Sequence, residues 1–201
     1  DAFDGAEADQ RPEREDSVSL AAAASKQRDP NNEYVTVRAS GTNKNPVNVT
    51  GWRLQNGSGN SIAIGRADPL PYPSREGVSG DILLAPRDAL YVITGRSPLG
   101  YGFRTNICIG YFQQNTRFVP PLPEQCPLLE DEVSPHAVND LCLDFIEDVP
   151  RCTTPTNNDL IERRVEPACR GVVLERTQYG WCVDQHRNDA NFRGNAWYAY
   201  L

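Results

Sequence analysis

Residues 84–94 read LAPRDALYVIT, and this stretch decides the fold. Its turn-forming part, 85–88, leads into a nearly continuous apolar run at 89–94, which favours a strand buried on both faces. Upstream, β-branched and polar residues alternate at 34–38, as in a half-buried strand. Three further strands and a hairpin loop are expected at 47–54, 61–64, 81–84 and 56–60. Several short strands separated by turns indicate a β-sandwich.

The segment 46–54 reads PVNVTGWRL and carries a second distinctive pattern. Apolar residues alternate with polar ones up to Gly51, which shifts the alternation by one residue, as a β-bulge would. Trp52 follows this glycine directly. We therefore expect one bulged strand with its apolar side chains directed to a single face.

Three motifs together resemble a bacterial lamin-tail domain: EYV at 33–35, PVNVTGWRL at 46–54 and LAPRDALYV at 84–92. This resemblance covers roughly residues 31–95 and implies an immunoglobulin-like β-sandwich, with Trp52 in its core. The chain is therefore expected to be mainly β, with the sandwich at 33–107. The family's closing strand pair, which carries an Asp-x-x-Gly turn followed by Val-Asp, has no counterpart here.

Residues 108–201 are expected to be a cysteine-rich insertion or extension of that sandwich. This part resembles insertions in surface-associated lamin-tail proteins of uncultivated bacteria. Its final segment, 196–201, is expected to return as a strand to the sandwich. Either the sequence stops before the closing strands, which we favour, or a neighbouring chain supplies them.

All six cysteines lie in this second part, at Cys108, Cys126, Cys142, Cys152, Cys169 and Cys182. An even number of cysteines in a loop-rich segment predicts disulfides, which persist in an oxidising compartment. The expected location is therefore extracytoplasmic, either secreted or at the cell surface.

Two amphipathic patterns predict that the cysteine-rich segment is partly helical. The first covers 138–149, beginning after Ser134-Pro135 and ending at Pro150, and a weaker one covers 167–176. An antiparallel pair of helices favours the bridges Cys152–Cys169, Cys142–Cys182 and Cys108–Cys126. This pairing is one among the many that six cysteines allow.

Residues 1–32 are acidic and poor in large apolar residues, so we expect a flexible arm or linker. An Ala-rich window at 17–26 favours a short helix within this arm. The chain begins at Asp1 and contains no methionine, so a processed form or an excerpt is expected, with any membrane anchor upstream of Asp1. The net charge of −7 disfavours nucleic acid as a partner, and no apolar run is long enough to enter a membrane as a spanning helix.

Four residue groups could carry chemistry, and each has a structural interpretation that we favour. Zinc could use Cys182 and His186 with Cys169, but the cysteine spacing favours disulfides. Calcium could use a cluster that is better explained as a surface turn: Asp184, Asn188, Asp189 and Asn191. Acid–base chemistry could pair Asp144 with Glu147 or Asp148, which are better explained as a solvated helix face. The aromatic residues that could contact a ligand are better explained by strand pairing: Trp181, Phe192, Trp197, Tyr198 and Tyr200.

The sequence therefore predicts a non-catalytic structural or binding module at a bacterial cell surface. Its expected partner is a protein or a cell-surface component, with no catalytic residues, no cofactor and no metal. Two alternatives are an accessory or targeting module of a secreted hydrolase, such as a nuclease or phosphatase, and a small zinc-binding module.

Overall fold

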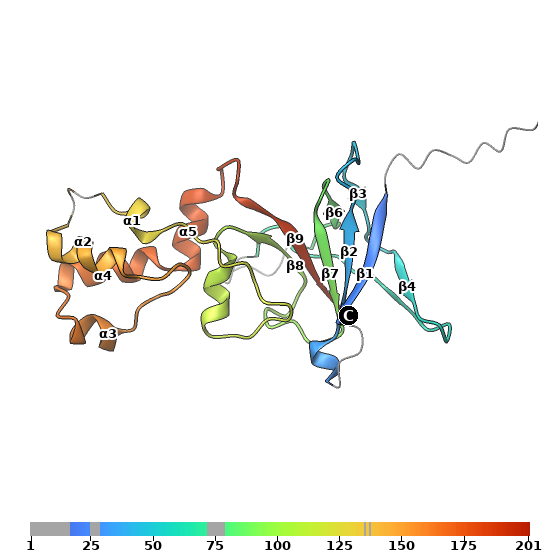
Figure 1. Cartoon of the computed structure of the whole chain (residues 1–201), viewed down its shortest axis with the longest axis horizontal. Helices are drawn as coiled ribbons and strands as arrows, with labels where there is room; N and C mark the ends of the chain where they lie inside the picture. Colours follow the sequence, from blue (N-terminus) through green and yellow to red (C-terminus); the bar gives the residue numbers. More distant parts are fainter. Residues whose placement is uncertain (1–16, 25–28, 72–78, 135, 137) are drawn as a thin grey trace, which may run out of the picture.

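A five-stranded sheet has the order β1-β2-β7-β9-β8 in the computed structural model, which describes residues 17–24, 29–71, 79–134, 136 and 138–201. Neighbouring strands are antiparallel except β7 and β9, which are parallel. Strands lie at one end of the molecule and most helices at the other, so the fold is mixed α/β (Figure 1). The strands span Val18–Ala24 (β1), Tyr34–Ala39 (β2), Ala89–Ile93 (β7), Phe103–Asn106 (β8) and Arg193–Tyr200 (β9).

Two small antiparallel sheets pack on one face of this central sheet. They pair β3 (Val47–Asn48) with β6 (Leu83–Leu84), and β4 (Arg53–Gln55) with β5 (Ser61–Ala63). The core between these layers includes Val37, Leu84, Leu90 and Trp197. Every second residue of β9 faces this core, because successive side chains of a strand point to opposite faces.

The other face of the central sheet carries aromatic residues. Tyr198 stacks on Phe103 with ring centroids 5.1 Å apart, and its hydroxyl donates to the Pro121 carbonyl oxygen. This core is closed by the 3₁₀ helix η2 (Ile109–Gln114) and by α5 (Tyr179–His186).

A third core joins the remaining helices, α1 (Leu129–Glu132), α2 (Asp140–Glu147), α3 (Asn157–Glu162) and α4 (Pro167–Arg176). The predicted helix at 167–176 is confirmed, with Pro167 in its first turn. The predicted helix at 138–149 is shorter at both ends. Its predicted start at Ser134 is wrong, because the Asn139 side chain caps α2 by accepting from the Cys142 backbone N–H. Pro135 lies outside the described residues.

All six cysteines form disulfides, as predicted, but the predicted pairing is wrong. The bridges are Cys108–Cys182, Cys126–Cys152 and Cys142–Cys169. The helices α2 and α4 face each other through Cys142 and Cys169, and the chain then returns through α5 to the end of β8. Three disulfides are consistent with an oxidising environment. Among the described residues, no helix has both the length and the hydropathy needed to cross a membrane.

Two predictions about the strands are also wrong. Residues 18–24, expected in a flexible arm or a short helix, form β1, because β2 offers backbone hydrogen-bond partners that outweigh the helical preference of alanine. Trp52 is 43% exposed, whereas Trp197 is 2% exposed and occupies the core. Gly51, with φ +81°, forms the predicted bulge: its N–H donates to the Ile64 carbonyl oxygen and the Ile64 N–H donates to the Trp52 carbonyl oxygen, so two residues oppose one. This bulge lies in a turn between β3 and β4, and Trp52 therefore leaves the inward alternation.

Candidate functional site

A largely apolar hollow of about 560 Å³ lies between the central sheet and the β4–β5 hairpin. Its sheet side is formed by Leu20 of β1, Val35 of β2 and Val92 of β7. Leu54 and Ile62 line it from the hairpin, where they are directly paired across the two strands. We call this hollow the apolar trough.

The apolar trough keeps large apolar side chains in contact with solvent. Leu20 is 62% exposed, Ile62 is 44% exposed and Leu201 is 38% exposed. Polar groups are confined to a smaller part of the lining: Glu33, Gln55, Asn56, Asn60, Ser61 and Thr94. Exposed apolar surface that is gathered in one hollow and edged by polar groups is typical of a binding site.

The hairpin that lines the trough is fixed by its own loop. The Asn56 side-chain oxygen accepts hydrogen bonds from the backbone N–H groups of Ser58 and Asn60, at 3.0 Å each. Gly59 takes φ +87°, a conformation that L residues rarely adopt. These constraints define the positions of Leu54 and Ile62 before any ligand arrives.

Strand β1 forms an outer edge of the central sheet, next to the apolar trough (Figure 1). Its sequence, VSLAAAA, contains no charged residue and no proline. Natural edge strands are usually protected by charges, prolines or bulges. Although the register between β1 and β2 shifts between Ala21 and Ala24, residues 18–21 pair regularly. The described structure therefore presents an edge that is open to strand addition.

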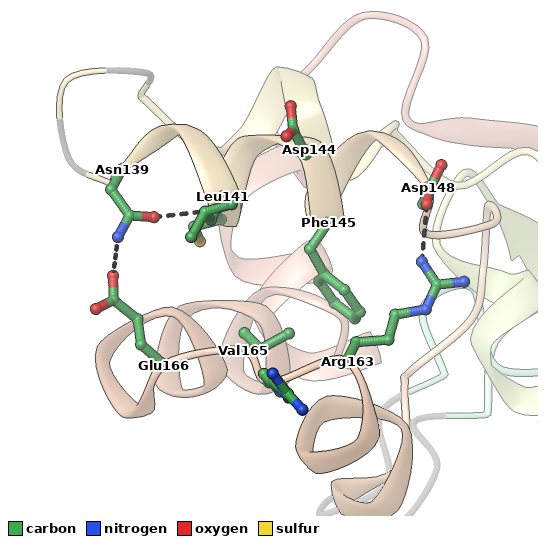
Figure 2. A pocket seen from close by; sticks show the side chains of 10 residues that line it. Asn139, Leu141, Asp144, Phe145, Asp148, Arg163, Val165 and Glu166 are labelled. Atoms are coloured by element: carbon green, nitrogen blue, oxygen red, sulfur yellow. Dashed lines mark hydrogen bonds and ion pairs between the residues drawn. The ribbon is translucent and has the colours of Figure 1, made fainter.

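A second hollow, of about 420 Å³, lies in the helical region between α2 and the α3–α4 connection (Figure 2). Several of its polar side chains contact one another. Arg163 pairs with Asp148 at 2.7 Å and lies over the Phe145 ring, and the Asn139 side chain donates to Glu166. We interpret these contacts as structural, because they hold α2 against the following helices.

The residues considered as an alternative zinc site are separated by the disulfides. The Cys182 sulfur is bonded to Cys108, and Cys169 is bonded to Cys142. His186 instead lies between two carboxylates: its Nε2 is 3.0 Å from Glu132 and its Nδ1 is 2.8 Å from Asp189. No group of three or more potential metal ligands occurs within the described part of the chain.

The remaining predicted groups occupy surface or core positions. Asp184 lies on α5, whereas the other members of the possible calcium cluster follow that helix. On α2, Asp144 and Glu147 are exposed. Three of the aromatic residues for which strand pairing was favoured over ligand contact are buried: Phe192, Trp197 and Tyr198. Trp181 and Tyr200 are partly buried.

The structure also contains a buried ion pair that the sequence did not indicate. Arg104 lies 3.2 Å from Asp88 and 5.4 Å from the Trp197 ring centroid. Burial raises the pKa of the Asp88 carboxyl and lowers the pKa of the Arg104 guanidinium, while their mutual attraction opposes both shifts. Asp88 also accepts from the Ala85 backbone N–H, so the pair fixes the turn before β7.

Comparison of the chain with protein-family models, curated proteins and solved structures finds no match.

Proposed function

We propose that this chain is a non-catalytic binding module that holds an extended, apolar segment of a partner protein. The segment would add to the sheet along β1 and place an apolar side chain in the trough. The observation that carries this proposal is the meeting of an edge strand that lacks charge and proline with an apolar hollow at Leu20. Strand addition uses backbone hydrogen bonds for affinity and side-chain pockets for specificity.

The proposed setting is the surface of a bacterial cell, outside the cytoplasm. The three disulfides support this setting because such bridges are rare in the reducing cytoplasm. The proposed fold type is an immunoglobulin-like sandwich related to lamin-tail domains. The core between the central sheet and the two small sheets supports that proposal.

The two alternatives lead to different expectations. The zinc site suggested by the sequence depends on the thiolates of Cys169 and Cys182, whereas all six cysteine sulfurs form disulfides. An accessory module of a secreted hydrolase would use the same binding surface, with a partner segment from that enzyme. We favour the general binding module because the trough and the edge account for it directly.

The test is selection from a library of displayed random peptides of about seven residues, the length of β1. We expect enrichment of peptides with alternating apolar residues. Ile62→Asp would place a charge in the trough, and Ala21→Lys would add a charge to the edge strand. Each substitution should weaken binding of a selected peptide by about tenfold or more.

The matched control is Leu141→Asp, because Leu141 is 79% exposed and lies on α2, outside the trough. This variant should bind the selected peptide as the unmodified protein does. Absence of enrichment would contradict the proposal. The same conclusion would follow if Leu141→Asp weakened binding as much as Ile62→Asp.

A further inference from the structure

A small pocket lies at the same end of the central sheet as the trough but is lined by the opposite side of the strand ends. Consecutive residues divide between the two hollows: Ile93 and Tyr200 line the small pocket, whereas Thr94 and Leu201 line the trough. The short helix η1 (Pro30–Asn32) also contributes, and it lies beside the end of β9 (Figure 1). The pocket has a volume of about 210 Å³.

Two arginines give this pocket its charge. Arg96 follows β7 and Arg117 follows η2, so segments distant in sequence bring two guanidinium groups to one hollow. Neither arginine forms an ion pair with another described residue, and within the described part of the chain no carboxylate lines the pocket. The remaining lining residues are neutral: Asn31, Asn32, Ile93, Pro98, Val119 and Tyr200. The pocket is thus locally cationic on a chain whose net charge is −7.

The wall formed by η1 is held in place by specific contacts. The Asp29 carboxylate accepts from the Asn31 backbone N–H and side chain, both at 2.9 Å, and from the Asn32 side chain at 3.1 Å. Gly95 packs against the same turn, since a Cβ at this position would lie 2.9 Å from the Asn31 carbonyl oxygen. The pocket therefore has a preformed wall.

One lining residue, Tyr200, also has a polar group without a hydrogen-bond partner in the described structure. The Tyr200 hydroxyl is buried and has no hydrogen-bond partner among the described residues. A buried hydroxyl without a hydrogen bond lowers stability unless a water molecule or another group supplies the missing bond. Because this hydroxyl has almost no accessible surface, the two arginines remain the donors that a bound group can reach.

We propose that Arg96 and Arg117 form a binding site for a single oxyanion group, a carboxylate or a phosphate. Guanidinium groups bind both of these through paired N–H donors, and the resulting charge-assisted hydrogen bonds are stronger than neutral ones. The apolar side chains of Ile93, Pro98 and Val119 would contact the organic part of the ligand. This site lies outside the trough, and the proposal does not depend on the peptide-binding function.

The experiment is calorimetric titration at low ionic strength with four probes: inorganic phosphate, acetate, phenyl phosphate and benzoate. We expect saturable binding at one site, tighter for the two probes that carry a ring. Arg96→Gln and Arg117→Gln should each weaken binding by about tenfold or more. Arg117→Lys should bind more tightly than Arg117→Gln because it keeps the charge.

The control is Arg66→Gln, which changes the net charge equally but removes an exposed arginine paired with Asp81 at 3.3 Å. It should leave binding of the probes unchanged. The stronger class of probe, phosphate or carboxylate, then identifies the source of the oxyanion.

Two results would overturn this site: the absence of saturable binding by all four probes, or an equal loss of binding in Arg66→Gln and Arg117→Gln. Neither result bears on the peptide selection, since none of the residues substituted here lines the trough. Conversely, failure of the peptide selection would leave the oxyanion titration unaffected.

Discussion

Cys108 and Cys182 are bonded to each other across 74 positions of sequence, and their bridge ties the segment after β8 to α5. Both sulfurs lie in the core beside Phe103 and Tyr198. The bridge therefore joins the sheet to the segment that returns from the helical end. The other two bridges span 26 and 27 positions and lie within the stretch that this bridge encloses.

Replacing both Cys108 and Cys182 by serine should lower the free energy of unfolding by about 4 kcal/mol, because the unfolded chain regains the freedom of a long loop. Denaturant unfolding monitored by tryptophan fluorescence measures this change. The comparison variant replaces Cys142 and Cys169, whose shorter loop should give a smaller loss of loop entropy. A change below about 1 kcal/mol in the first variant would contradict the structural role assigned to the bridge.

Tyr198 connects the aromatic core to the loop at Pro121, and its two contacts can be separated. Tyr198→Ala removes the stacking on Phe103 and leaves a cavity, so we expect a loss of about 3–5 kcal/mol in unfolding free energy. Tyr198→Phe keeps the ring and removes only the hydrogen bond to Pro121, which should cost about 1 kcal/mol. Equal losses in the two variants would show that packing is not the main contribution.

Alkaline pH should destabilise the fold through buried tyrosines. Burial, with a smaller contribution from Glu132, raises the pKa of Tyr111 to about 12, and burial also raises the pKa of Tyr198 and Tyr200. The folded state therefore holds these protons more tightly than the unfolded state, whose tyrosines ionise near pH 10, as model tyrosines do. Their contribution to stability is complete below pH 10 and is lost as the pH rises towards the folded values.

Absorbance titration near 295 nm and urea unfolding across this pH range provide the measurement. Each late-ionising tyrosine should contribute a slope of up to about 1.4 kcal/mol per pH unit. Tyr111→Phe should reduce the steepness of the decline above pH 10. If all eight tyrosines ionised together with ordinary pKa values in the native protein, the expected pH dependence would be wrong.

His186 should stabilise the contact between α1 and α5. Its side chain is 18% exposed and that of its partner Glu132 is 15% exposed, so His186→Ala leaves a largely buried carboxylate without this contact. We expect a loss of about 1–3 kcal/mol in thermal or denaturant unfolding. Asp189 contacts the other ring nitrogen of His186, and its side chain is 48% exposed. Asp189→Ala should therefore cost less than about 1 kcal/mol. The reverse order would contradict this assignment.

Local sequence patterns predicted the elements that depend on neighbouring residues. The apolar run at 89–94 became β7, the polar loop at 56–60 became the turn of the β4–β5 hairpin, and α4 has the predicted bounds. Each of these depends on spacing or turn chemistry within a few residues. The six cysteines likewise indicated disulfides through their number and context alone.

The errors concern relationships between distant segments. The strand β1 forms only because β2 lies beside it, and alanine's own preference gave no indication of that pairing. The disulfide pairing depended on the path from α4 through α5, which spacing does not define. Neither the trough nor the small pocket could be predicted from the sequence, for the same reason. Leu20 and Leu54 line one hollow, and Arg96 and Arg117 line the other, only after the chain has folded.

The position of β9 between β7 and β8 also has a consequence for synthesis of the chain. The eight described strands β1 to β8 all precede β9 in the chain, yet the sheet order leaves a gap between β7 and β8 until residues 193–200 leave the ribosome. Trp197 and Tyr198 then complete two cores from opposite faces of one strand. A nascent chain that lacks these residues would keep both apolar layers open to water, so chaperones would encounter it until translation of this strand is finished.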